Sequence, residues 1–227
     1  MSVRGGDRAE GRWTATVRGW IYDRFVAGLT TEWYREVLNR LPDRAKLLDV
    51  GIGTGAALAR SADLVLAKEL EVVGLDIDAD YLERCRTEVA RAGLADRVTP
   101  LLASVYDHRG GPYDAAYFSA SLMLLPDPVR ALSHVASQLV PGGRLFTTQT
   151  FHHRRSTILE WAKPLFHRVT TIHFGRVTYE QEFRNTFAEA GVELVELTTL
   201  ADRRRSSYRL AVGRAGDSPG GHAVGIL

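Results

Sequence analysis

The sequence has very little cysteine and no long hydrophobic run, and each absence excludes a class of protein. The single cysteine among 227 residues is Cys85, which excludes an intramolecular disulfide and a cysteine-based zinc cluster. No apolar run approaches membrane-spanning length, and residues 1–11 contain no stretch of the signal-peptide type. We therefore expect a cytoplasmic protein. The net charge of only +2 gives no strong indication of a nucleic-acid partner.

Short apolar runs alternate along the chain with amphipathic runs of helical length. This alternation predicts an α/β fold in which helices cover both faces of a parallel sheet. We expect strands near 46–50, 71–76, 97–102, 113–119 and 143–149, and helices near 55–67, 79–93, 127–139 and 178–190. Two further strands, 192–200 and 207–212, follow the last helix and are joined by a short charged loop. They are expected to pair antiparallel at the sheet edge.

A glycine-rich segment follows the first predicted strand. Asp49 ends the apolar run, and Gly51, Gly53 and Gly55 come at alternate positions after it. Glycines in a strand-to-helix turn permit positive φ angles and let a ligand approach the backbone closely. The second predicted strand ends in Asp76, whose carboxylate is expected beside the glycines, where it can accept hydrogen bonds from a ribose diol. These residues predict a site for a cofactor that contains a nucleoside.

Two kinds of cofactor fit a glycine loop of this type. The spacing also matches a relaxed dinucleotide fingerprint, but the carboxylate of Asp49 would repel a pyrophosphate and suits a cofactor that carries an ammonium group. The segment of Asp49, Gly51, Gly53 and Gly55, together with Asp76, resembles motif I and the following acidic position of class I S-adenosylmethionine-dependent methyltransferases. The antiparallel pair at the end of the chain resembles the sixth and seventh strands of that family.

The resemblance covers about residues 45–213 and implies a Rossmann-like fold, doubly wound around a mostly parallel seven-stranded sheet. Residues 12–213 would form one methyltransferase domain, with a helical lid at 12–42 and a second lid segment at 154–177. Residues 1–11 and 214–227 are expected to be disordered because they are polar and rich in glycine.

The ends of the predicted strands supply the remaining site residues, because ligands of such sheets bind at the carboxyl ends of the strands. The resemblance implies that the cofactor contacts Ile77 after the second strand and Ser104 and Val105 after the third. The commoner family pattern has an acid where Ser104 stands, and Ser104 also fits a simple turn residue. After the fourth strand, the resemblance implies that Ser119 lies beside the cofactor and that Ser121 and Met123 lie beside the substrate.

Two histidines, His152 and His153, follow the fifth predicted strand. A histidine at that position is a candidate general base for an oxygen or nitrogen acceptor. The same pair, followed by two arginines, also fits a solvated basic loop. The spacing of the histidines matches no standard metal-ligand motif, so no metal site is expected.

Aromatic residues are concentrated in the N-terminal part of the chain, from Trp13 to Leu41. This part is predicted to form one or two amphipathic helices over the cofactor. Tyr22 and Asp23 resemble a pair that precedes motif I in many small-molecule methyltransferases, so Trp20 and Tyr22 are candidates for substrate contact. The alternative for any single aromatic is ordinary core packing.

The sequence thus predicts methylation of a small-molecule oxygen or nitrogen acceptor, with S-adenosyl-L-methionine as donor and S-adenosyl-L-homocysteine as product. An NAD(P)-dependent oxidoreductase and a non-catalytic S-adenosylmethionine-binding regulator remain alternatives, as does a nucleic-acid or protein acceptor. The only basic run, residues 203–205, fits a solvated hairpin loop better than a nucleic-acid contact. The sequence leaves the oligomeric state open, with a homodimer through the lid helices as one option.

Overall fold

The computed structural model describes residues 30–152, 178–203 and 206–215. In chain order, its elements are β1 (Lys46–Val50), α2 (Ala56–Ala59), α3 (Ala62–Ala67), β2 (Glu71–Asp76), α4 (Ala79–Arg91), β3 (Val98–Leu102), β4 (Tyr113–Ser119), the short 3₁₀ helix η1 (Leu122–Leu124), α5 (Pro128–Ala136), β5 (Leu139–His152), α7 (Glu180–Glu189), β6 (Val192–Asp202) and β7 (Ser206–Ala215). A further helical stretch covers residues 30–39.

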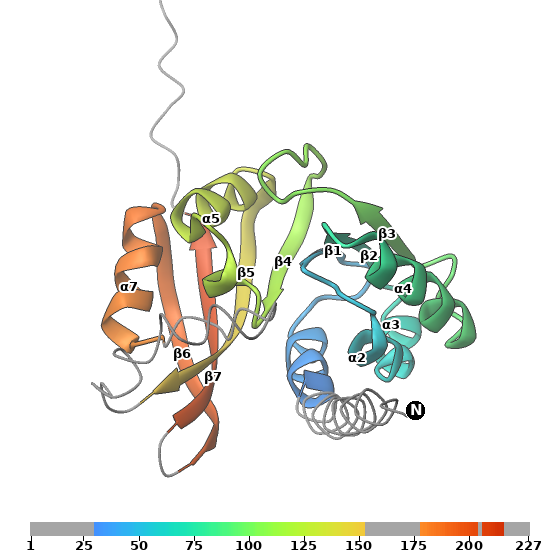
Figure 1. Cartoon of the computed structure of the whole chain (residues 1–227), viewed down its shortest axis with the longest axis horizontal. Coiled ribbons are helices and arrows are strands. Elements are labelled where there is room, and N and C mark those ends of the chain that lie inside the picture. The colour runs from blue at the N-terminus through green and yellow to red at the C-terminus, as the bar shows by residue number, and fades with distance from the viewer. Residues whose placement is uncertain (1–29, 153–177, 204–205, 216–227) are drawn as a thin grey trace, which may run out of the picture.

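The strands form one seven-stranded sheet in the order β3-β2-β1-β4-β5-β7-β6. The first five strands are parallel, whereas β7 pairs antiparallel with both β5 and β6. Figure 1 shows α2, α3 and α4 together at one side of the sheet and α5 and α7 at the other. The predicted fold class, a doubly wound and mostly parallel seven-stranded sheet, is confirmed. β4 and β5 continue the parallel sheet, and the β6–β7 hairpin stands where a dinucleotide-binding fold has its parallel sixth strand.

Two apolar cores lie on opposite faces of the sheet. The first contains Leu58, Val65 and Leu82 from α2, α3 and α4, and Leu38 from the 30–39 helix. The second contains Leu132 of α5 and Phe183 and Phe187 of α7. Apolar side chains of the strands point alternately to the two cores, so the strands are buried from both sides, as a parallel sheet covered by helices requires.

The 30–39 helix packs on the sheet as part of the first core. Tyr34, Val37, Leu38 and Leu41, spaced by three and four residues, are all buried there, which is the stripe expected of an amphipathic helix. The Nζ of Lys68, just after α3, donates to the carbonyl oxygens of Leu38, Asn39 and Leu41, groups that the end of a helix leaves without partners. The rest of the expected 12–42 lid lies outside the described residues.

The helix expected at 55–67 is in fact two short helices. Ser61, fully buried, interrupts it: its hydroxyl donates to the carbonyl oxygen of Ala57, and its N–H donates to that of Leu58. A buried serine that bonds back to the preceding turn competes with the helical ladder, so α2 ends at Ala59 and α3 begins at Ala62.

The fifth strand is longer than expected. The sequence predicts a helix to about residue 139 and a strand from about residue 143, but β5 already begins at Leu139. Leu139 pairs with Tyr113, and the next pair is Arg144 with Ala115. The proline and glycines of residues 141–143 therefore form a bulge inside the strand, which is a position where both residue types occur.

Candidate functional site

The glycine loop lies between β1 and α2, at the carboxyl end of the sheet. Gly51 and Gly55 have φ angles of 80° and 66°, which residues with side chains rarely adopt. A Cβ at Gly51 would lie 2.9 Å from the Cβ of Ser121, and one at Gly55 would lie 2.6 Å from the Sγ of Cys85. Both positions therefore exclude a side chain, because of the backbone conformation and because of their neighbours.

Gly53, at the middle of the loop, differs from the other two. Its φ is also positive, at 58°, yet a Cβ there would meet no atom within 4 Å. The loop at this point faces open space, so packing within the described protein does not require the glycine. A bare backbone beside open space is the arrangement that lets a ligand approach closely.

The loop is fixed to β2 on its inner side. The N–H groups of Gly51 and Ile52 both donate to the carbonyl oxygen of Leu75, at 2.8 and 3.0 Å. The buried side chain of Ile52 lies against Gly74, where a Cβ would come within 2.3 Å of the Ile52 Cδ1. Gly74 in β2 thus creates the room in which the loop sits.

The carboxylate of Asp76 reaches the loop from the end of β2, as the sequence predicts. Its Oδ2 accepts a 2.9 Å hydrogen bond from the N–H of Gly53, and its Oδ1 accepts one of 2.9 Å from the N–H of Asp78. Each carboxylate oxygen has two acceptor positions, so each retains one for a ligand. Two free acceptor positions on one carboxylate match the two hydroxyls of a ribose diol.

Two large apolar side chains near the Asp76 carboxylate are exposed. One follows Asp76 in the sequence, and the other lies opposite it on the neighbouring strand. Ile77 is 77% exposed, and Leu102, at the end of the neighbouring β3, is 59% exposed. Asp76 pairs with Leu102 in the register of β2 and β3. Apolar surface at this place fits the flat face of a nucleobase.

Ser104 and Val105 follow β3. The Ser104 hydroxyl accepts a hydrogen bond from the N–H of Tyr106, and the Ser104 carbonyl oxygen accepts from Asp107 and His108. Ser104 therefore begins a turn, as the alternative interpretation of the sequence expects, and its O–H is still able to donate. The Val105 side chain is buried in the second core, so that any ligand contact would come from its backbone.

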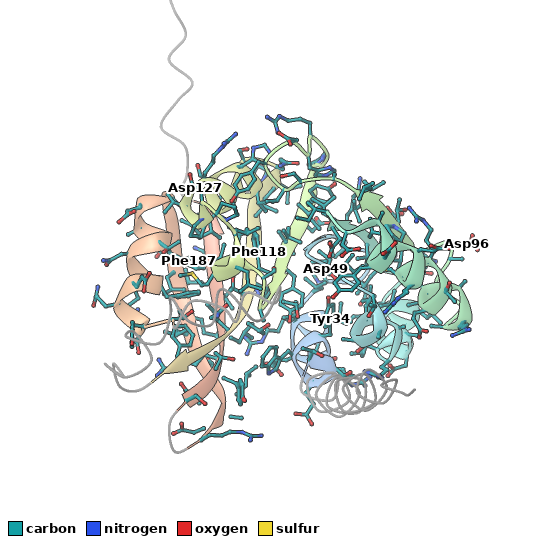
Figure 2. The ribbon with its side chains drawn as sticks, viewed as in Figure 1. Tyr34, Asp49, Asp96, Phe118, Asp127 and Phe187 are labelled. Carbon is teal, nitrogen blue, oxygen red and sulfur yellow. The ribbon has the colours of Figure 1, made fainter. Side chains whose placement is uncertain are left out.

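Asp49 is the most buried charged group of the site. It is fully buried on β1, where its Oδ2 accepts a 2.7 Å hydrogen bond from the hydroxyl of Tyr34, and its Oδ1 has no hydrogen-bond partner among the described residues. Figure 2 shows the two side chains next to each other, between the 30–39 helix and β1. Burial raises the pKa of Asp49 to about 7, and the charge of Asp76 acts in the same direction.

The segment after β4 packs against the start of the glycine loop, on the side opposite β2. Ala120 has a positive φ of 55°, a conformation that is strained for alanine. The hydroxyl of Ser121 donates a 2.6 Å hydrogen bond to the carbonyl oxygen of Val50, and Ser119, at the end of β4, is half-buried. Ser119 and Ser121 thus lie near the loop, whereas Met123 is buried in the second core.

Several predicted residues lie outside what the structure describes. His152 ends β5, although its side chain is not described, and Trp20, Tyr22, His153 and the 154–177 segment belong to the parts of the chain without described structure. Their roles stay predictions. Within residues 30–152, 178–203 and 206–215, no three histidine, cysteine or acidic side chains gather to form a metal site. None of the helices in these ranges is long and apolar enough to cross a membrane.

Two site residues escaped the sequence analysis. Tyr34 lies in the aromatic-rich part from Trp13 to Leu41 without a predicted role of its own, and Ala120 has no predicted role. The helical spacing of Tyr34 with Val37, Leu38 and Leu41 is a signal for burial, but nothing local indicates that Asp49, 15 residues away, is its partner. The strain at Ala120 leaves no trace in the sequence.

The glycine loop, the Asp76 carboxylate and the exposed side chains of Ile77 and Leu102 fit a nucleoside-containing cofactor. The sheet order is that of the class I methyltransferase fold. Comparison with known proteins agrees. A protein-family model described as "Methyltransferase domain" matches residues 47–143. The chain is 28% identical over 186 residues to a demethylmenaquinone methyltransferase of Lactiplantibacillus plantarum, covering 74% of this chain and 76% of that protein. It is also 28% identical to methyltransferase GfsG of Streptomyces halstedii, covering 70% of this chain and 57% of that protein.

Solved structures show the same fold. A geranyl diphosphate C-methyltransferase from Streptomyces coelicolor A3(2), in complex with Mg²⁺, geranyl diphosphate and S-adenosyl-L-homocysteine, superposes with a TM-score of 0.65 at 13% identity, covering 83% of this chain and 77% of that one. These matches support a class I S-adenosylmethionine-dependent methyltransferase, and S-adenosylmethionine is the methyl donor of that class. Of the first three curated relatives the chain spans 76%, 24% and 57% of the length.

Proposed function

We propose that the protein transfers the methyl group of S-adenosylmethionine to an oxygen or nitrogen atom of a small molecule. The observation that carries the donor site is the shared contact of Gly53 and Asp76, in which a bare backbone and a carboxylate with free acceptor positions meet at the open side of the loop. A small acceptor is supported by the relatives, one of which is named for demethylmenaquinone. Residues 117–123 lack the Asn/Asp-Pro-Pro-aromatic segment of many enzymes that methylate bases.

In this proposal, each part of the site binds one part of the donor. Asp76 accepts hydrogen bonds from the ribose hydroxyls, and the exposed Ile77 contacts the adenine from one side, with Ser104 and the backbone of Val105 at its edge. The loop of Gly51, Gly53 and Gly55 passes along the amino-acid end, with Asp49 beneath it and Ser119 beside it. Ser121 keeps the loop in place through the Val50 carbonyl oxygen.

The donor supplies a methyl group on a sulfonium, which is reactive enough for direct displacement. The protein's own residues therefore have to hold donor and acceptor in line and exclude water. His152 or His153, at the carboxyl end of β5, is the proposed base that takes the proton from a hydroxyl or ammonium acceptor. Trp20, Tyr22, Ser121 and Met123 are the proposed substrate contacts; because the Met123 side chain is buried in the second core, its contact would come from its backbone.

A carbon acceptor is the second candidate, and one observation favours it. A solved structure with the same fold is named as a C-methyltransferase acting on geranyl diphosphate. An activated carbon nucleophile needs less help from a base than a hydroxyl does, so the two candidates differ in how strongly they depend on the histidines.

Calorimetry with S-adenosylmethionine, S-adenosyl-L-homocysteine and NAD(P)H tests the donor. We expect the first two to bind and the nicotinamide cofactors not to bind; the reverse result would overturn the proposal. Turnover is then measured as release of S-adenosyl-L-homocysteine with hydroxylated, amine and quinone acceptors. His152→Ala and His153→Ala should slow the reaction about 10²- to 10⁴-fold if one histidine is a general base, whereas full activity in both variants would favour a carbon acceptor.

A further inference from the structure

A buried carboxylate with a single partner lies directly beneath the glycine loop. Asp49 stands two residues before Gly51, is fully buried, and has one described hydrogen bond, from the Tyr34 hydroxyl. Its second oxygen has no partner among the described residues. Buried polar atoms nearly always have partners, so an unsatisfied carboxylate oxygen calls for an explanation. A cationic ligand in the adjacent loop would provide one.

The groups packed around Asp49 do not neutralise it. Tyr34 lies on the 30–39 helix, and Asp76, at the end of β2, raises the pKa of Asp49 by repulsion. The Asp49 charge in turn raises the pKa values of Cys85 of α4 and Tyr117 of β4. Among the described interactions that shift the pKa values of these groups, the one cation is Arg86 on α4, and it acts on Cys85 and not on Asp49. Asp49 therefore faces one hydroxyl donor, two weak acids and another carboxylate.

Tyr34 is held firmly enough to fix the direction of its hydroxyl. Its ring is buried and lies edge-on to Tyr117, with centroids 5.0 Å apart. The helix that carries it is tied to α3 by Lys68 and by the Arg35–Asp63 pair, and to β6 by the Arg40–Glu196 pair. The position of the hydroxyl is thus set by the docking of the helix, and the Asp49 carboxylate is positioned in turn.

The methyl donor and its product differ by one positive charge. S-adenosylmethionine carries a sulfonium, an ammonium and a carboxylate, whereas S-adenosyl-L-homocysteine has lost the sulfonium charge with the methyl group. A negative charge beneath the loop attracts the donor more than the product. In a site of low dielectric, an added interaction between two unit charges changes a dissociation constant about tenfold or more.

We propose that Tyr34 is a positioning residue that holds the Asp49 carboxylate beneath the glycine loop, and that this carboxylate is the group by which the protein prefers the donor, with its sulfonium charge, to the zwitterionic product. The inference rests on the proposed donor site and adds to it a means of product release. Because Asp49 titrates near neutral pH, with a pKa of about 7, the preference should be weak at pH 6 and strong at pH 8.5.

The test is the ratio of two affinities, measured by calorimetry on the full chain from pH 6 to pH 8.5. The ligands' own amino groups can also titrate in this range, and the neighbouring sulfonium makes the donor's amino group the more acidic. The protein's contribution is therefore the ratio of product to donor dissociation constants in the natural protein divided by the same ratio in Asp49→Asn at each pH. We expect the ratio to rise about tenfold across this range in the natural protein. In Asp49→Asn the ratio should be low and should change with pH only as far as the ligands' own amino groups titrate.

Tyr34→Phe removes the hydroxyl and keeps the ring. It should leave product binding intact, lower the ratio at pH 7.5, and move its rise to higher pH, because the Tyr34 hydrogen bond lowers the pKa of Asp49. Tyr113→Phe is the matched control: in the other core it also removes a buried tyrosine hydroxyl, whose partner is His108, and should keep the natural ratio at every pH.

Three outcomes decide the matter. A natural ratio and pH dependence in Tyr34→Phe would overturn the role of Tyr34. The same ratio in Asp49→Asn as in the natural protein at every pH would overturn that of Asp49, and this variant decides alone if Tyr34→Phe does not fold. Failure of the natural protein to bind either ligand would instead overturn the donor site itself.

Discussion

The backbone N–H of Gly53 donates a 2.9 Å hydrogen bond to Asp76 Oδ2, which joins the middle of the glycine loop to the end of the neighbouring strand. One group thus serves two purposes: the carboxylate stabilises the loop and presents its remaining acceptor positions to the open side. Loss of Asp76 should therefore affect the shape of the loop as well as the binding of a ligand.

Replacing Asp76 tests this double role. Asp76→Ala should weaken S-adenosylmethionine binding by about 1.5–3 kcal/mol for each charge-assisted hydrogen bond lost, which corresponds to at least tenfold by calorimetry. Asp80→Asn, an exposed acid in the first turn of α4, is the control and should bind normally. Unchanged affinity in Asp76→Ala would show that this residue does not hold the ribose.

Alanine substitution at two glycines with positive φ angles distinguishes the effect of backbone strain on stability from an effect on ligand binding. Gly53 and Gly142 have φ angles of 58° and 79°, and a Cβ at either position meets nothing within 4 Å. Alanine at each should lower the free energy of unfolding by about 1–2 kcal/mol, measured by denaturant titration. Only Gly53→Ala should also lose donor binding; equal binding by the two variants would mean that no ligand approaches Gly53 closely.

The free energy of unfolding of the ligand-free protein should depend on pH because of the raised pKa of Asp49. Its folded-state pKa of about 7 lies above the ordinary 3.8, so folding favours the protonated carboxyl, and this contribution is lost as the pH rises from about 4 through 7. Asp49→Asn avoids the loss and keeps an acceptor for Tyr34. It should be more stable than the natural protein by as much as about 4 kcal/mol at pH 8.5, and by only about 1 kcal/mol at pH 4.5. A difference that does not vary with pH would contradict the raised pKa.

Lys68 is expected to fix the 30–39 helix to α3. Lys68→Met keeps the aliphatic stem and removes the donors to Leu38, Asn39 and Leu41, which should lower the free energy of unfolding by about 1–3 kcal/mol. Arg91→Met provides the control, since its ion pair with Glu88 is largely exposed and contributes little. Equal effects in the two variants would show that the helix is held by apolar packing alone.

The parts of the fold that are predictable from sequence are those with a local cause. Gly51, Gly53 and Gly55 mark a turn by their own conformational freedom, and Asp127 and Pro128 mark the start of α5, where the Asp127 side chain accepts from the N–H of Arg130. The parts that are not predictable depend on partners far along the chain. Pro141–Gly143 has the composition of a turn, and only pairing with β4 makes it a bulge.

The same distinction applies to the site. Asp76 lies where the sequence predicts because it ends an apolar run, and the register of β1 and β2 brings it to the loop. The burial of Met123 and the bond between Tyr34 and Asp49 follow from how helices dock on the sheet, which no spacing in the sequence records. The predictions for the methyl donor were therefore better founded than those for the acceptor.

The antiparallel insertion of β7 has a consequence for how the chain is synthesised. Because β7 lies between β5 and β6, a growing chain that has not yet released residues 206–215 from the ribosome leaves the facing edges of both strands unpaired. Open strand edges readily pair with other chains, and contacts between distant segments form late. A newly made chain is thus most prone to aggregate before β7 has left the ribosome. A chain shortened to end before Ser206 should therefore aggregate.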